Sequence, residues 1–215
     1  MSQPERYRYR IKFSKTQAMR FTSHLDLHRA WERTFRRAEM PLTYSQGYNP
    51  RPKINLASAL PLGFTSCCEL IDVWFDEALP EQDILARLRQ AAPPGIQVTE
   101  VQQIDLRQNA LQQSLIAAEY QAFIDEDLST NDLAQKAEAL LSQDSIPRRR
   151  RGKDYDLRPL IETLTAFSNE DDQPLLEMKL TALEGATGRP DEVLEALGLD
   201  PLAARIERTA LHIAS

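Results

Sequence analysis

Apolar and basic residues alternate at the start of the chain. The apolar set, with a period of two, is Tyr7, Tyr9, Ile11 and Phe13. The basic set between them is Arg6, Arg8, Arg10 and Lys12. Side chains on a strand point alternately to its two faces, so this pattern predicts a half-buried strand. We expect its basic row to lie on the open face of a sheet.

A helix is predicted to follow, from Ser23 to Ala38. Ser23 and Asp26 have the spacing of a capping box, with Asp in place of the usual Glu. Apolar residues then recur at helical spacing, at Leu27, Trp31, Phe35 and Ala38. Four arginines lie on the other side of this predicted helix, namely Arg29, Arg33, Arg36 and Arg37.

The segment from Tyr44 to Ser66 is rich in Pro, Gly and Asn, which predicts a long loop with a short strand at 54–59. A strand at 69–75, a helix at 80–91 and a strand at 96–104 are predicted next, and the last slips in phase between Val98 and Val101 as at a bulge. The order strand, helix, strand, strand, helix, strand is that of the ferredoxin-like motif, an antiparallel sheet with both helices on one face.

The second half repeats this order of elements. Strands are predicted at 115–125, 145–151, 174–183 and 203–213, helices at 130–142 and 190–198, and residues 157–167 are ambiguous. A polar stretch at 105–113 separates the halves. We therefore expect an α+β protein with two tandem ferredoxin-like halves, residues 1–108 and 109–215.

Charge is distributed unevenly over the 215 residues, although the net charge is −6. Residues 1–60 hold 12 Lys and Arg against 4 Asp and Glu, a net of +8, whereas the remainder holds 14 against 28, a net of −14. This asymmetry predicts a basic surface on the first half and an acidic second half. No apolar run approaches the roughly 20 residues that span a bilayer, and the N-terminus lacks the apolar core of a signal peptide. We expect a cytoplasmic protein with no membrane contact.

The basic residues on phased faces favour RNA as a partner, because phosphate backbones attract such patches. Tyr44 and Tyr48 could stack on unpaired bases. The alternative is a solvated face that pairs with the acidic second half. The candidate RNA contacts are Arg6, Arg8, Arg10, Arg33, Arg36, Arg37, Tyr44, Tyr48, Asn49, Arg51, Lys53, Arg148, Arg149, Arg150 and Arg151.

Little in the sequence indicates catalysis or a cofactor. His24 and His28 are four residues apart and could share a helix face as an acid–base pair, or simply face solvent in the first turn. A metal-independent ribonuclease could use His24. Adjacent Cys67 and Cys68 lack zinc or iron–sulfur spacing, so no metal or cofactor is expected.

Two carboxylates lie on the strand predicted at 69–75. Glu69 and Asp72 are three apart on a predicted strand, so they point to opposite faces and form no catalytic pair. We expect ordinary edge-strand charges, although Glu69 could orient Arg51 or Lys53.

Residues 20–75 carry four short motifs, R-F-x-S-H-L-D, R-R-A, Y-S-x-G-[FY]-N-P-x-P-K and L-P-L-G-x-x-S-x-x-E. With them the chain resembles the radical-SAM-linked bacterial proteins of unknown function, which occur beside or fused behind a radical SAM protein. The resemblance implies a radical SAM partner and no activity that can be carried over. This chain lacks the three-cysteine motif of that enzyme, so radical chemistry would be the partner's.

Three hypotheses follow for the function. The first is an accessory, non-catalytic RNA-binding module that presents RNA to a radical SAM enzyme. The second is a metal-independent endoribonuclease that uses His24. The third is a protein-interaction module for the radical SAM partner without RNA binding.

Overall fold

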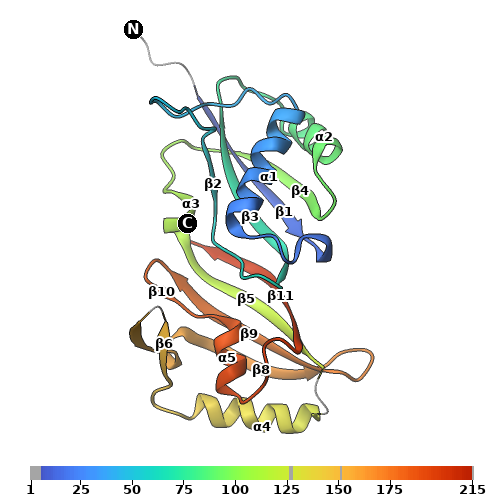
Figure 1. Ribbon diagram of the computed structural model, residues 1–215, viewed down its shortest axis with the longest axis vertical. Helices are drawn as coiled ribbons and strands as arrows, with labels where there is room; N and C mark the ends of the chain where they lie inside the picture. The colour runs from blue at the N-terminus through green and yellow to red at the C-terminus, as the bar shows by residue number, and fades with distance from the viewer. Residues whose placement is uncertain (1–5, 126–127, 151, 215) are drawn as a thin grey trace. The chain divides into compact units, whose positions relative to one another are not determined.

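The computed structural model describes residues 6–125, 128–150 and 152–214, and the chain divides into two compact units, residues 1–114 and 115–215. The expected α+β class is confirmed (Figure 1). The boundary lies after Ser114 rather than at 108/109, so the short helix α3 (Leu111–Ser114) belongs to the first unit. None of the helices in the described ranges is long and apolar enough to cross a membrane.

The first unit contains a four-stranded antiparallel sheet in the order β4–β1–β3–β2. Its elements along the chain are β1 (Tyr7–Lys15), α1 (His24–Arg37), β2 (Ile54–Leu56), β3 (Thr65–Phe75), α2 (Glu81–Ala91) and β4 (Ile96–Ile104). The expected order of elements is therefore present. β2 is shorter and β3 begins earlier than predicted, so the long loop ends before Thr65.

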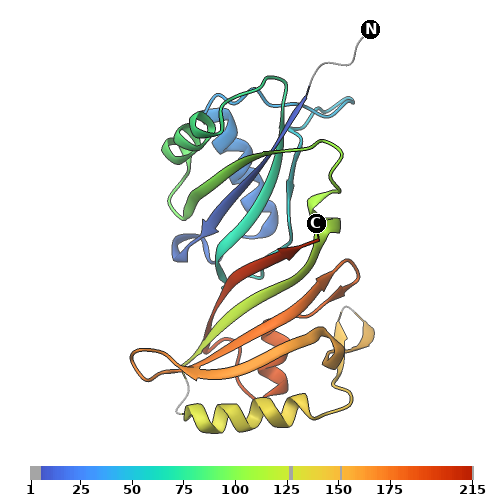
Figure 2. The same ribbon diagram turned by 180° about the vertical axis from the view of Figure 1, so that it is seen from behind.

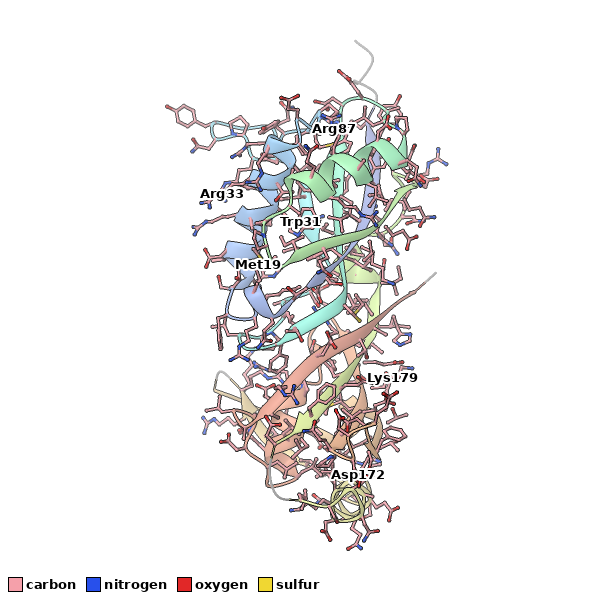
Figure 3. All side chains as sticks on the ribbon, turned by 90° about the vertical axis from the view of Figure 1, so that its right-hand side faces the viewer. Met19, Trp31, Arg33, Arg87, Asp172 and Lys179 are labelled. Carbon is pink, nitrogen blue, oxygen red and sulfur yellow. The ribbon has the colours of Figure 1, made fainter. Side chains whose placement is uncertain are left out.

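Both helices of the first unit cover the same face of its sheet, and Figure 2 shows the strands from the other side. The Ser23 hydroxyl accepts a hydrogen bond from the Asp26 N–H at 3.2 Å, which confirms the predicted cap of α1. Trp31, which Figure 3 labels, is completely buried. Its ring meets that of Phe13 on β1 edge to face, with centroids 4.8 Å apart. The apolar stripe of α1 thus meets the apolar row of β1 as predicted.

The predicted bulge lies in β4. Lys12 of β1 pairs with Glu100, whereas the next residue, Phe13, pairs with Val98. Thr99 is therefore the extra residue, and it restores an inward direction to both Val98 and Val101, which are buried.

In the second unit β11, β5, β9 and β8 are antiparallel neighbours in that order, and β10 also pairs with β9. Its elements are β5 (Leu115–Ile124), α4 (Thr130–Leu141), β6 (Pro147–Arg150), β7 (Lys153–Asp156), β8 (Ile161–Ser168), β9 (Pro174–Leu183), β10 (Ala186–Thr187), α5 (Pro190–Ala196) and β11 (Ala204–Ile213). The ambiguous residues 157–167 hold most of β8, which pairs along β9.

The predicted strand at 145–151 is present as β6, but it is not a strand of the larger sheet. β6 pairs only with β7, in a separate two-stranded sheet that we call the arginine hairpin, residues 147–156. Gly152 takes a φ of +80° in its turn, a conformation that favours glycine, and β8 occupies the place in the larger sheet.

Candidate functional site

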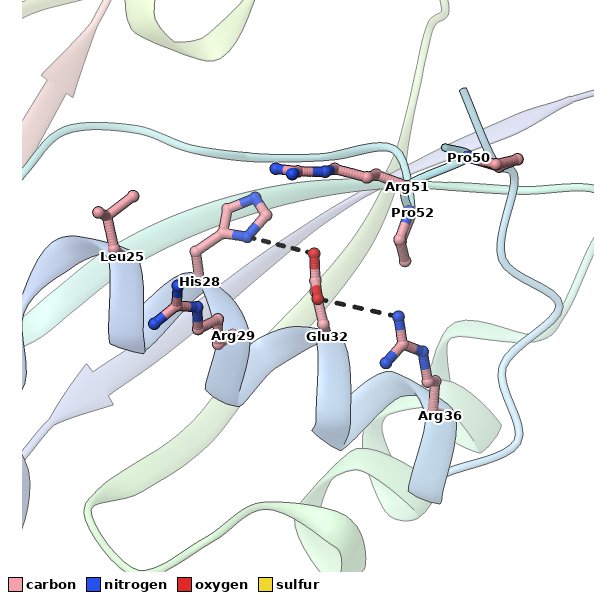
Figure 4. Close-up of a pocket in the computed structure, with 8 residues that line it drawn as sticks. All are labelled: Leu25, His28, Arg29, Glu32, Arg36, Pro50, Arg51 and Pro52. Atoms are coloured by element: carbon pink, nitrogen blue, oxygen red, sulfur yellow. Dashed lines mark ion pairs between the residues drawn. The ribbon is translucent and has the colours of Figure 1, made fainter. Parts of the chain in front are cut away.

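A pocket of about 330 Å³ lies between α1 and the loop that precedes β2 (Figure 4). Its lining residues are Leu25, His28, Arg29, Glu32, Arg36, Pro50, Arg51 and Pro52. We call it the arginine pocket, because arginines from both the helix and the loop contribute to it. Its lining contains three arginines and a single carboxylate, that of Glu32.

The helical side of the pocket is a row of side chains spaced four apart. Glu32 Oε1 lies 3.6 Å from Nδ1 of His28, and Glu32 Oε2 lies 3.8 Å from Nη2 of Arg36 (Figure 4). Asp26 meets Arg29 at 3.2 Å outside the pocket. Glu32 was not predicted as a site residue, although its i, i+4 spacing with His28 and with Arg36 was a usable signal. His28 was considered only as the partner of His24.

The opposite side is held by a small hairpin in the loop. The Ser45 N–H donates to the Arg51 carbonyl at 2.8 Å, and the Arg51 N–H donates to the Ser45 hydroxyl at 3.0 Å. Tyr44 and Pro52 form a β-bridge beside them. The turn displays Tyr48, which is 100% exposed, and Asn49. These bonds fix the Arg51 backbone and so direct its side chain over α1 (Figure 4).

The candidate pair Arg36 and Arg37 is divided between two surfaces. Arg36 lines the pocket, whereas Arg37 donates to the carbonyl of Ala91 at the C-terminal end of α2. Arg33 is exposed and points away from the sheet (Figure 3). Adjacent residues on a helix point about 100° apart, so only Arg36 of the pair reaches the loop side.

The expectation of an open basic row on β1 is wrong for Arg8, which is only 2% exposed. Its guanidinium donates to Asp72 and to the carbonyls of Gln108 and Asn109. Arg10 also donates to Asp72, at 2.8 and 3.0 Å. The row is therefore partly covered, two of its arginines share one carboxylate, and Arg8 is a structural side chain.

The same contacts correct the expectation for the two carboxylates. Asp72 and Glu69 are both buried rather than ordinary edge-strand charges. Asp72 lies between two strands, because it pairs with Arg10 of β1 on one side and with Asn55 of β2 on the other.

Arg8 and Lys53 both lie against the Trp74 ring, and Arg6 lies near Lys53. The Lys53 ammonium lies 4.5 Å from the centre of the Trp74 ring, a cation–π contact. Burial, and then the nearby Arg6 and Arg8, lower the pKa of Lys53. Lys53 is exposed and Arg6 is half-buried, so both can meet a ligand.

The arginine hairpin uses one of its arginines to dock on α5. Arg150 and the Tyr155 hydroxyl both donate to Glu192, and Arg150 also donates to the Thr187 carbonyl at 3.0 Å. Burial and the hydrogen bond to Glu192 raise the pKa of Tyr155 to about 12. Although burial alone would raise the pKa of Glu192, hydrogen bonds from Arg150 and Tyr155 lower it. Arg150 is therefore a structural side chain.

The neighbours of Arg150 differ from it in their contacts. Arg149 is exposed and lies 3.7 Å from Asp154, and Arg148 is half-buried. Arg151 lies outside the described residues.

His24, the candidate catalytic residue, is the first residue of α1 and is half-buried. The histidine that lines the arginine pocket is His28, not His24. Within the described ranges, no group of three or more His, Cys, Asp or Glu side chains could hold a metal ion. Cys68 is buried and Cys67 exposed, and neither forms a disulfide in the part that the structure describes.

A family model described as "Uncharacterized protein conserved in bacteria (DUF2344)" matches residues 8–190. The chain belongs to this family. The match spans both units and contains every residue of the arginine pocket. No curated protein matches the DUF2344 chain.

Solved structures include a fold similar to that of this DUF2344 chain. One is a chain of a Cbf5–Nop10–Gar1 complex, with a TM-score of 0.51 and 11% sequence identity, over 94% of this chain and 48% of that one. The DUF2344 chain thus spans about half the length of that chain. At this identity the likeness concerns the fold alone.

Proposed function

We propose that this protein is an accessory RNA-binding module that presents RNA to a radical SAM enzyme. The observation that carries the proposal is the arginine pocket, whose lining contains Arg29, Arg36 and Arg51 and only one carboxylate. Guanidinium groups bind phosphate through paired N–H donors. The excess of positive charge in a concave site therefore suits a phosphate of an RNA backbone.

The loop beside the pocket suits contacts to bases. Tyr48 is fully exposed at the turn, and Tyr44 and Asn49 are also exposed. Aromatic side chains bind unpaired bases by stacking, and an amide can hydrogen-bond a base edge. Arg33, Arg148 and Arg149, with Arg6 and Lys53, would extend the basic surface.

We further infer that each unit is ferredoxin-like. In the first unit the strands lie in the order β4–β1–β3–β2, and the corresponding order in the second is β11–β5–β9–β8. All pairs are antiparallel, as the split βαβ motif requires. The arginine hairpin is then an insertion between α4 and β8.

Direct binding measurements test the RNA proposal. Arg36→Glu and Arg51→Glu should each weaken the binding of single-stranded RNA by about tenfold or more at moderate salt. Arg205→Glu is the matched control, because Arg205 is an exposed arginine of β11 outside the proposed surface and the substitution changes the net charge equally. Unchanged affinity in both pocket variants would show that RNA does not use this site.

The radical SAM partner rests on the four sequence motifs, and co-purification from cells tests it. A radical SAM protein that is recovered together with RNA supports the adaptor. Recovery of the enzyme without RNA, combined with no RNA affinity of the purified chain, would instead support the protein-interaction module.

One observation keeps an endoribonuclease as a second candidate. His28 lines the same pocket as three arginines, which is where a general acid or base would need to lie. Cleavage of RNA in the presence of a chelator, lost in His28→Ala or His24→Ala while RNA binding persists, would establish it. Intact RNA after prolonged incubation with the wild type would exclude it for the RNAs tested.

A further inference from the structure

Three large apolar side chains are exposed around the N-terminal end of α1. Phe21 is 69% exposed, Leu25 is 68% exposed and Leu62 is 60% exposed. Leu25 lines the arginine pocket, and Phe21 lies four residues before it. Single exposed apolar residues are common, but a group of them beside a charged pocket indicates a binding surface.

The Phe21 ring is held in place although it is exposed. The Arg20 guanidinium lies 4.4 Å from the ring centre, as a cation–π partner. Gly63 lies against the ring edge, because a Cβ on Gly63 would be 3.8 Å from Cε1 of Phe21. The backbone is tied as well, since the Gly63 N–H donates to the Arg20 carbonyl at 2.9 Å. An ordered ring loses little conformational entropy when a ligand stacks on it.

Two arginines are neighbours of this group. Arg20 borders Phe21, and Arg29 lines the pocket next to Leu25. Asp26 is the acidic residue of this helical turn, and it accepts from the Ser23 hydroxyl and Arg29. A flat apolar ligand attached to a negative group matches such a surface, and a nucleotide of single-stranded RNA has both parts.

We infer that Phe21, with Leu25 and Leu62, is a platform for one unpaired base whose neighbouring phosphate lies in the arginine pocket. This inference rests on the proposed RNA binding and deepens it, because it specifies single-stranded RNA as the ligand class. An aromatic ring stacks on any base, so the platform selects for an unpaired base rather than for a sequence. A base within a duplex is already stacked and cannot occupy it.

Binding of the full chain to a single-stranded oligonucleotide and to a duplex of equal length tests the platform. Phe21→Ala should weaken single-strand binding by about tenfold, and Phe21→Trp should retain it. Duplex binding, which needs only the phosphates, should be unchanged in both variants. Phe167→Ala is the matched control, because Phe167 is an exposed phenylalanine of β8 in the second unit.

The outcomes separate this inference from the proposed function. If Arg51→Glu weakens single-strand binding but Phe21→Ala does not, the platform is wrong and the RNA site remains. If Arg36→Glu and Arg51→Glu have no effect either, the proposed function itself fails. If Phe21→Ala abolishes co-purification of a partner protein and leaves RNA affinity intact, the apolar group is a protein-docking surface, and the platform is overturned.

Discussion

Arg8 and Asp72 form a buried ion pair, with Nη2 of Arg8 2.5 Å from Oδ2 of Asp72. Arg10 shares the same carboxylate, with Nε at 2.8 Å from Oδ1. Two arginines on adjacent outward positions of β1 therefore converge on one aspartate of β3, directly across from Arg10 in the antiparallel register. Charges that leave water in this way must be paired, which explains why a basic row can lie inside the fold.

Asp72→Ala should destabilise the protein more than any surface substitution. It leaves the Arg8 charge buried without a counter-ion, so we expect the free energy of unfolding to fall by about 3–5 kcal/mol. Asp154→Ala is the control, because Asp154 is largely exposed, and it should change the unfolding free energy by less than about 0.5 kcal/mol. Chemical denaturation measures both. Equal effects of the two substitutions would contradict the buried pair.

The salt dependence of RNA binding should report the number of arginines that contact phosphate. Replacing Arg36 or Arg51 by Gln removes one charge, and each replacement should reduce the slope of log affinity against log salt by about 0.7 for single-stranded RNA. Arg205→Gln should leave the slope as in the wild type. Titrations at several salt concentrations give the slopes, and parallel lines for all four proteins would argue against phosphate contacts in the pocket.

The Tyr155 hydroxyl should ionise only at high pH, and its ionisation should lower the free energy of unfolding. Its folded-state pKa is raised to about 12 from an ordinary value of 10.0. The stability that the neutral phenol contributes is therefore fully present below about pH 10 and is lost as the pH rises toward about 12. The difference in tyrosinate absorbance between the wild type and Tyr155→Phe should titrate near pH 12. A midpoint near 10 would mean that the hydroxyl is not held by Glu192.

Glu192→Gln should loosen the arginine hairpin. Glu192 accepts hydrogen bonds from Arg150 and Tyr155, and the neutral amide cannot form the ion pair. We expect faster cleavage by trypsin at residues 148–150, because the protease needs an extended, undocked segment. Glu195→Gln, an exposed change on the same helix, is the control. Digestion followed by mass spectrometry locates the cuts, and equal rates in the two variants would mean that Glu192 does not hold the hairpin.

Most elements were predictable because their patterns are local. The period of two at Tyr9, Ile11 and Phe13 and the helical spacing of Leu27 and Trp31 each follow from where side chains point along a strand or a helix. All five residues are buried as predicted. The cap at Ser23 and the bulge in β4 were also predictable, since each depends on residues within a few positions.

The predictions that failed concern contacts between distant segments. Arg8 was predicted to be exposed, because the pattern of its own strand does not indicate a contact with Asp72, 64 residues away, or with the carbonyls of Gln108 and Asn109. The arginine run at 148–151 forms part of a strand as predicted, but its local pattern gives no sign of the partner of Arg150, which is Glu192, 42 residues further on. A local sequence pattern does not reveal partners that are far away along the chain, and a charged side chain can be buried only where such a partner is present.

The sequence by itself determined the α+β class, the helix and strand periods, the basic first segment and the loop in which Tyr48 and Arg51 lie. Each of these follows from side-chain direction, backbone preference or local charge. The tertiary structure decided which basic residues keep their charge available. It paired both Arg8 and Arg10 with one aspartate, turned Arg37 toward α2, and placed Arg36 opposite Arg51. Electrostatic pairing acts through space over a few ångströms, so only the folded chain selects the partners.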